Sequence, residues 1–211
     1  MIKINELDDR NLMMLLELRQ SGILDDRIFN AITSLSKKIF LPDNLKGFSN
    51  EDLDLKIFSN VIASKTSDIA KMIFLGLSKN SNTRNVLEIG TGSGWQTALL
   101  SKIYNRVYTI EINKQAYQFS SKILENISNK ISFKFGDGKE GWFEAAPFDA
   151  IYIDCEVVEE PKYLYSNLVE KDGVIILVKN YKGKQFYTSY SPNDKDILFK
   201  SIYEVNRTKL I

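Results

Sequence analysis

VLEIGTGSGWQ, at residues 86 to 96, is the stretch of sequence that decides the fold of this chain. Apolar β-formers, among them Val86 and Leu87, lead into a loop with alternating glycines. Glycine lets the backbone turn sharply and approach a ligand that a Cβ would push away. The run from Trp95 to Leu100 then predicts a helix whose first amide groups face the same ligand. A strand, a glycine loop and a helix in this order indicate an α/β protein that holds a nucleoside-bearing cofactor.

The spacing of the glycines bears on the identity of that cofactor. A dinucleotide-binding loop requires G-x-G-x-x-G, but the bulky Trp95 stands at the third glycine position. What remains is Glu88 followed by Gly90, Gly92 and Gly94, which resembles motif I of the class I S-adenosylmethionine-dependent methyltransferases. In those enzymes the glycines border the methionyl part of the cofactor, and the acid helps to hold its ammonium group. A tight turn without a ligand is the alternative that the glycines alone leave open.

Composition narrows the classes of function. With 211 residues, of which 44% are hydrophobic, the chain can bury a full core, and we expect one domain over residues 1–211. The formal net charge is +1 and no basic stripe interleaved with aromatic residues stands out, so nothing favours a nucleic-acid partner. No apolar run approaches the ~18 residues of a membrane span, and the N-terminal MIKINELDD lacks the apolar core of a signal peptide. We therefore expect a cytoplasmic enzyme without a membrane partner.

Two residue types limit the chemistry. Cys155 is the only cysteine, which excludes an intrachain disulfide. Because the chain has no histidine, imidazole cannot act as a general base and a histidine-ligated zinc site cannot form. We expect a reaction that needs neither an imidazole base nor a histidine-ligated zinc ion, and we expect no bound metal.

Strands and helices alternate after the glycine loop. We expect strands near residues 85–89, 107–111, 131–135, 149–153 and 173–178, and helices near 95–104, 114–127 and 160–169. The tail segments 186–191 and 197–205 are expected to close the sheet as an antiparallel pair. The alternation predicts an α/β fold with a mostly parallel sheet and helices on both faces. With the closing hairpin, the pattern resembles the seven-stranded, Rossmann-like sheet of the class I methyltransferases.

The N-terminal part predicts helices. Leucines from Leu12 to Leu18 sit near helical spacing, and Asp25 with Asp26 predicts a cap before a second apolar run. Pro42 ends this region, and a further helix at 68–77 leads into the glycine loop. We expect an N-terminal helical segment at 1–80 and a cofactor-binding core at 81–211.

In an open α/β sheet the ligand lies beyond the carboxyl ends of the strands. Glu111 ends the second core strand about 21 residues after the first glycine, where a carboxylate can accept from both ribose hydroxyls. Asp137 lies between two glycines where the adenine amino group would be. A solvated strand-end acid and a plain glycine turn remain the alternatives for these two. The residues predicted to contact the cofactor are Glu88, Gly90, Thr91, Gly92, Gly94, Glu111, Ile112, Asp137, Gly138 and Asp154.

Several segments together resemble one family, the protein-L-isoaspartate O-methyltransferases. IGTGSGWQ, VYTIE and GDGKEGW are similar to that family's IGTGSGYQ, VYTIE and GDGxxGW. SGILDDRIFNAI at 21–32 and IFLP at 39–42 are similar to its R-G-I-x-D-x-R-V-L-x-A-M and F-V-P. The resemblance covers about residues 10–180. It implies that S-adenosylmethionine donates a methyl group to the α-carboxylate of isoaspartyl residues in damaged proteins, and that residues 1–80 form the acceptor side.

The acceptor side departs from the family pattern at two places. The family's T-I-S triplet, whose serine lies at the active site, becomes Ile62-Ala63-Ser64, so Ser64 is the candidate catalytic residue. Where the family has small residues after the fourth core strand, this chain has Asp154. That carboxylate would repel an isoaspartyl carboxylate or need to be neutralised. A helix-capping role is the alternative for Ser64.

Two other functions stay open. FDAIYID at 148–154 also resembles the catechol-type metal-dependent O-methyltransferases, in which an aspartate at the position of Asp154 ligates a divalent cation. Their second ligand pair, Asp-Asn, appears here as Lys179-Asn180, so one acidic ligand is missing. The third possibility is a cofactor-binding homologue that has lost isoaspartyl activity. The sequence does not indicate an oligomeric state.

Overall fold

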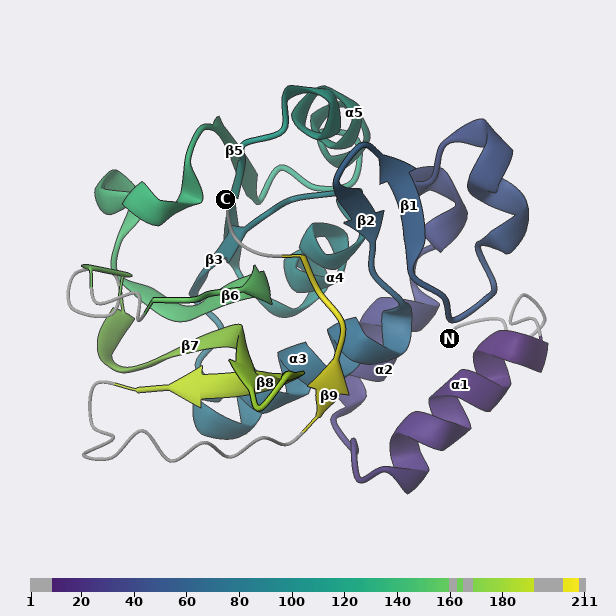
Figure 1. The fold of residues 1–211 in the computed structure, drawn as a ribbon, viewed down its shortest axis with the longest axis horizontal. Helices are drawn as coiled ribbons and strands as arrows, with labels where there is room; N and C mark the ends of the chain where they lie inside the picture. The colour runs from purple at the N-terminus through teal and green to yellow at the C-terminus, as the bar shows by residue number, and fades with distance from the viewer. Residues whose placement is uncertain (1–8, 160–162, 165–168, 192–202, 209–211) are drawn as a thin grey trace.

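A seven-stranded sheet forms the centre of the molecule, with strand order β5-β4-β3-β6-β7-β8-β9 (Figure 1). The computed structural model describes residues 9–159, 163–164, 169–191 and 203–208. The strands are β3 (Asn85–Ile89), β4 (Arg106–Glu111), β5 (Ile131–Phe135), β6 (Phe148–Glu156), β7 (Val169–Tyr181), β8 (Lys184–Tyr190) and β9 (Glu204–Val205). The helices are α1 (Asp9–Gln20), α2 (Asp26–Thr33), α3 (Thr66–Lys79), α4 (Trp95–Ile103) and α5 (Lys114–Leu124), with short 3-10 turns at Lys37–Phe40, Asp43–Phe48, Gly138–Glu140 and Phe143–Ala145.

The pairing of the strands confirms the predicted α/β architecture. β3 lies between β4 and β6, and the five strands from β5 to β7 pair in parallel. β8 pairs antiparallel with both β7 and β9, so it forms a hairpin with β7 as well as the predicted pair with the tail. Most of the helix predicted at 160–169, and residues 197–202 of the last predicted strand, lie outside the described residues.

The N-terminal region contains the predicted helices and one hairpin that the sequence patterns did not predict. Asp25 caps α2 by accepting a hydrogen bond from the amide of Arg27 at 2.9 Å. β1 (Leu55–Phe58) and β2 (Val61–Ala63) pair antiparallel as a separate two-stranded sheet. Their alternation of buried and exposed side chains spans too few residues to stand out from the helical pattern around it.

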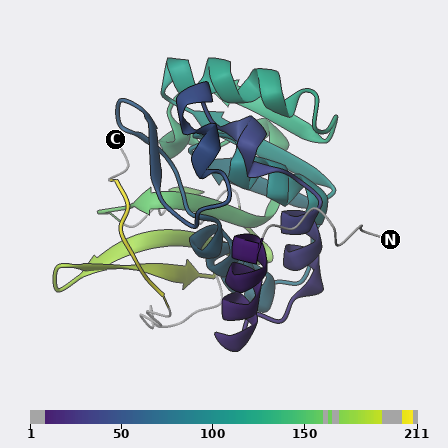
Figure 2. The ribbon, with the colours of Figure 1, turned by 90° about the vertical axis from the view of Figure 1, so that its right-hand side faces the viewer.

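Both faces of the central strands are buried, as is usual for parallel sheets. Val86 and Ile176 face a cluster built with α1 to α4, whereas Leu87 and Ile175 face a cluster on the opposite side. Figure 2 shows α5 at one end of the molecule, away from α1 and from the β7–β8 hairpin. The core therefore fixes the central strands, and the loops at their carboxyl ends stand on a rigid base.

One glycine sets how closely α3 approaches the sheet. A Cβ added at Gly76 would lie 2.1 Å from the hydroxyl oxygen of Tyr152, which is fully buried on β6 and donates to the carbonyl of Ile73 at 3.3 Å. The helix can pack there only because Gly76 has no side chain.

We expect Gly76→Ala to lower the free energy of unfolding by about 1 to 3 kcal/mol, because the added methyl overpacks the core. The measurement is chemical denaturation monitored by circular dichroism. Gly47→Ala is the matched control, because no atom lies within 4 Å of a Cβ at that position. A Gly76→Ala variant as stable as the control would contradict this account of the packing.

Candidate functional site

The glycine loop and the N-terminal segment meet at one cavity. This cavity has a volume of about 70 Å³ and lies beyond the carboxyl ends of β3 and β6. Gly90 to Ser93 line one side, and Ser64, Asp154 and Arg207 line the other. In Figures 1 and 2 the yellow C-terminal segment runs from β9 past the end of β6 toward the β1–β2 hairpin. Segments from the N-terminal and C-terminal parts of the chain therefore lie together at the edge of the sheet where ligands bind in this type of fold.

The loop between β3 and α4 has a backbone that glycine favours. Gly90, Gly92 and Gly94 have φ values of +95°, +55° and +85°, all in the left-handed region. A Cβ at Gly90 would meet no atom within 4 Å, so this side of the loop is open to a ligand. At Gly94, the N-cap of α4, a Cβ would lie 3.0 Å from Leu124. The loop thus exposes backbone at its start and packs tightly at its end.

Glu111 is buried at the end of β4, with 5% of its surface exposed. One carboxylate oxygen accepts the amide of Gly92 at 2.8 Å, and the other accepts the amide of Asn113 at 2.8 Å. The reading of Glu111 as a solvated strand-end acid is therefore wrong. Because each oxygen retains a second lone pair, the carboxylate can still accept hydrogen bonds from a ligand.

Glu88 is buried beneath the loop and has one oxygen to spare. It accepts hydrogen bonds from the hydroxyls of Thr97 and Thr109. Within the described part of the chain, its Oε1 atom has no hydrogen-bond partner. Burial, with smaller contributions from the charges of Glu111 and Asp154, raises the pKa of Glu88 to about 8 against the effect of the two threonines. A cationic donor placed at the unpaired oxygen would stabilise the ionised form of this carboxyl group and give the oxygen its missing partner.

In the segment after β5, two residues predicted to contact the cofactor also have structural roles. Asp137 caps the 3-10 turn Gly138–Glu140 by accepting the amide of Lys139 at 2.9 Å. A Cβ at Gly138 would lie 2.1 Å from Cγ2 of Ile89, so packing alone requires this glycine. Ile112 is 48% exposed just after β4, where an apolar surface is available to a ligand.

Ser64 contacts Asp154 rather than a helix end. Its hydroxyl donates to Oδ2 of Asp154 at 2.6 Å, while Lys65 occupies the N-cap of α3. The helix-capping reading of Ser64 is therefore wrong. The buried ammonium of Lys37 donates to the carbonyl oxygen of Ser64 at 3.1 Å, and burial lowers the pKa of this lysine to about 8 against the charges of Asp52 and Asp54.

Arg207 lines the cavity, and the sequence patterns did not predict it. Its guanidinium is buried, and Nε donates to Oδ1 of Asp154 at 2.7 Å. It also forms ion pairs with Asp68 at 3.0 Å and Asp54 at 3.3 Å. Although burial opposes its charge, Asp154 and its other neighbours raise the pKa of Arg207 above the usual value. The carboxylate at Asp154 is therefore neutralised, and the need for a countercharge was the one signal in the sequence that pointed to such a residue.

The groups around Asp154 do not suit a divalent cation. Searching the described residues finds no group of three or more histidine, cysteine, aspartate or glutamate side chains that could hold a metal. Asp154 faces a guanidinium, and Lys179 donates to the carbonyl of Val158 at 2.9 Å. Oxygen-ligated cations prefer several anionic ligands without a competing cation. The donor set therefore does not favour the catechol-type reading.

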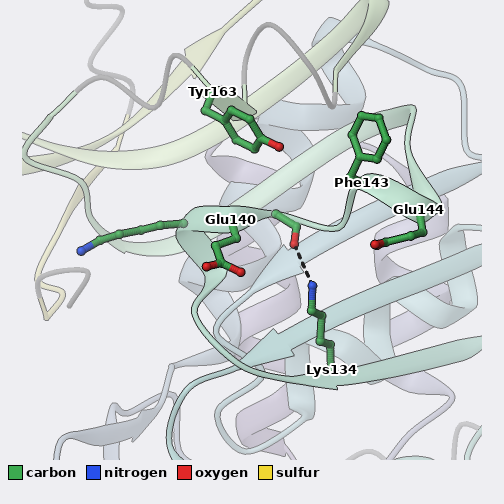
Figure 3. A pocket seen from close by; sticks show the side chains of 7 residues that line it. Lys134, Glu140, Phe143, Glu144 and Tyr163 are labelled. Carbon is green, nitrogen blue, oxygen red and sulfur yellow. Dashed lines mark hydrogen bonds between the residues drawn. The ribbon is translucent and has the colours of Figure 1, made fainter.

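A larger cavity, of about 460 Å³, lies elsewhere, beside the segment that follows β5. Figure 3 shows the rings of Phe143 and Tyr163 at its rim, with Lys134 directed to the backbone below them. Lys134 donates to the carbonyl of Gly141 at 3.5 Å. Lys139, Glu140, Gly141 and Glu144 also line this cavity, and none of the predicted cofactor residues contributes to it. We therefore place the functional site at the smaller cavity.

The chain was compared with known proteins. The family model described as protein-L-isoaspartate(D-aspartate) O-methyltransferase matches residues 9–207. The chain belongs to this family. Protein-L-isoaspartate O-methyltransferase of Chlorobaculum parvum is 36% identical over 160 residues, covering 76% of this chain and 72% of that protein. The homologue of Hahella chejuensis is 30% identical over 205 residues, covering 95% and 94%.

Solved structures of the protein-L-isoaspartate O-methyltransferase family share the fold. A structure titled protein-L-isoaspartate O-methyltransferase superposes with a TM-score of 0.79 at 21% identity, covering 95% of this chain and 65% of that longer chain. A structure from Plasmodium falciparum, described as a complex with S-adenosyl-L-homocysteine, gives a TM-score of 0.76 at 20% identity, covering 94% and 97%. These likenesses confirm the predicted class I methyltransferase architecture. None of the described helices combines the length and the apolar character needed to cross a membrane.

Glu88 gives the protein a pH-dependent component of stability. Because the pKa is raised from 4.5 to about 8, the folded state retains a proton that the unfolded state releases in this range. The contribution is complete below pH 4.5 and is lost as the pH rises to about 8. Glu88→Gln stays neutral, so we expect its Tm relative to wild type to rise between pH 5 and pH 8.5. Differential scanning calorimetry at both pH values checks this, with the exposed Glu125→Gln as control. Parallel pH profiles for the wild type and Glu88→Gln would refute the assignment.

Proposed function

We propose that this chain is an S-adenosylmethionine-dependent protein-L-isoaspartate O-methyltransferase that methylates isoaspartyl residues in damaged proteins. The observation that carries the proposal is the cavity that the glycine loop and Ser64 line together. The names of the relatives and the bound S-adenosyl-L-homocysteine of the Plasmodium falciparum structure support it.

The residues around the loop fit the proposed cofactor. When bound, S-adenosylmethionine supplies a methyl group on a positively charged sulfur. Glu88 would hold the ammonium group through its unpaired oxygen, and Glu111 would accept from the ribose hydroxyls. Ile112 and Asp137 lie at the ends of the neighbouring strands β4 and β5, where the adenine would bind. Gly90, Thr91 and Gly92 line the cavity with backbone that lets the ligand approach closely.

The chemistry needs no general base from the protein. A carboxylate with a pKa of about 3.5 to 4 is ionised at pH 7, so no proton has to be removed from the nucleophile. This agrees with the absence of histidine from the chain. The task of the site is to position the acceptor beside Ser64 and to exclude water, because orientation alone can supply several kcal/mol.

We also propose that residues 1–80 and 81–211 are the acceptor and cofactor segments of one methyltransferase domain. Ser64 and Ile62 line the cavity from the first segment, and the glycine loop lines it from the second. Asp154 and Arg207, which belong to the second segment, complete the acceptor end. Cytoplasmic action on isoaspartyl proteins is part of the same proposal, supported by the absence of any possible intrachain disulfide.

We expect Glu111→Ala to weaken the binding of S-adenosylmethionine about tenfold to a hundredfold, because it removes charge-assisted hydrogen bonds to the ribose. Isothermal titration calorimetry measures the change. Glu144→Ala, in the larger cavity, is the matched control and should bind the cofactor like wild type. The ribose assignment fails if Glu111→Ala binds as tightly as the control.

We expect label from S-adenosylmethionine to reach an isoaspartyl peptide but not the same peptide with a normal aspartyl residue. The assay counts labelled methyl ester, and chelation of divalent cations should leave the rate unchanged. Label in neither peptide would refute the repair function while leaving cofactor binding to be judged by calorimetry. Loss of activity on chelation, restored by magnesium, would instead favour the catechol-type alternative.

A further inference from the structure

The acceptor end of the cavity contains a carboxylate that belongs to the protein itself. Oδ2 of Asp154 accepts the hydroxyl of Ser64 at 2.6 Å. Oδ1 of Asp154 accepts the hydroxyl of Tyr187 at 2.8 Å and Nε of Arg207 at 2.7 Å. A serine hydroxyl has one proton to donate. The hydroxyl of Ser64, the candidate catalytic residue, therefore already donates its proton to a carboxylate of the protein itself.

Arg207 is committed to holding Asp154 in place. Beyond the bond to Asp154, one terminal nitrogen donates to Asp54 at 3.3 Å and to the carbonyl of Asn206 at 2.9 Å. The other donates to Asp68 at 3.0 Å and to the hydroxyl of Tyr187 at 3.1 Å. A guanidinium has five N–H groups, and these five contacts account for all of them. Arg207 consequently has no donor left for an acceptor carboxylate.

The backbone around Arg207 is held as firmly as its side chain. The side-chain amide of Gln185 on β8 accepts the amide of Arg207 at 2.5 Å and donates to its carbonyl at 2.9 Å. On the other side, the amide of Glu156 donates to the carbonyl of Thr208 at 2.7 Å. The segment thus bridges the end of β6 and the start of β8, and it sets the position of the guanidinium.

These contacts create competition at the acceptor end. An acceptor that binds through a carboxylate needs the hydroxyl of Ser64, and it brings a second negative charge close to Asp154. Like charges placed together in a buried interface are strongly unfavourable. Arg207 offsets the charge of Asp154 but also locks Asp154 onto Ser64.

We propose that Asp154 and Arg207 form a specificity-determining pair, in which Asp154 competes with the acceptor carboxylate for the hydroxyl of Ser64 and Arg207 keeps Asp154 in that position. The inference rests on the proposed isoaspartyl function. We therefore expect this chain to bind carboxylate acceptors with lower affinity than a variant with a neutral side chain at position 154.

The test measures acceptor binding without turnover. An isoaspartyl peptide is titrated by calorimetry into wild type and Asp154→Asn, each saturated with S-adenosyl-L-homocysteine. We expect the variant to bind the peptide about tenfold more tightly, because the substitution removes the repulsion and weakens the competing hydrogen bond. Adding Ser64→Ala to Asp154→Asn should abolish most of this gain.

Asp68→Asn is the matched control, because it removes the same charge from the same arginine but does not line the cavity. The proposal is overturned if Asp154→Asn binds the peptide no more tightly than wild type. It is also overturned if Asp68→Asn gains as much affinity for the peptide, or if the double variant Asp154→Asn with Ser64→Ala keeps the full gain. If thermal melting shows that Asp154→Asn does not fold, Asp154→Ala removes the same charge, leaves Arg207 paired with Asp54 and Asp68, and carries the same expectation. Methyl transfer by the wild type is scored separately, so a failure of the proposed function is distinguished from a failure of the pair.

Discussion

The parallel pairing of β3 with both β4 and β6 is the constraint on which the arrangement of functional groups depends. In parallel strands the carboxyl ends meet at one edge, so Glu111 at the end of β4 and Asp154 near the end of β6 lie on either side of the glycine loop. The buried faces of the central strands hold this edge still. The glycine loop and Asp154 are therefore brought to one small cavity by the pairing of the strands that carry them.

Local chemistry made the cofactor half of the site predictable from sequence. The loop from Gly90 to Gly94, the acid Glu111 and the turn at Asp137 each follow a strand within a few residues, so their positions follow from the element boundaries. The structure adds why Glu111 is buried, since the amide of Gly92 needs an acceptor. The arrangement from β3 to β5 was predictable for the same reason, because these strands alternate with α4 and α5 at ordinary spacing.

The acceptor half could be predicted only in part. Ser64 was identified as the serine kept from a family triplet and Asp154 as a departure from the family pattern, but their contact joins residues 90 positions apart. Arg207 lies 53 positions from Asp154, beyond the segments that carry the resemblance, and nothing near it in sequence indicates a buried cation. The sequence also gives no sign that Lys37 is buried, since a lysine near the end of an N-terminal helical region ordinarily lies in solvent. Charge balance in the folded protein selects these residues, and it becomes visible only when distant segments are assembled.

The contact between Gly76 and Tyr152 has a consequence for the far end of α3. Asp68 precedes Gly76 by about two turns of the same helix, a rise of about 12 Å. Because the helix is stiff, the depth to which Gly76 seats against β6 also fixes how far Asp68 reaches toward Arg207. The helix thus fixes the distance between the hydrophobic core and the charged acceptor end. Natural variation at the glycine would have to be accompanied by readjustment of the acids around the arginine, although no atom of the two sites is shared.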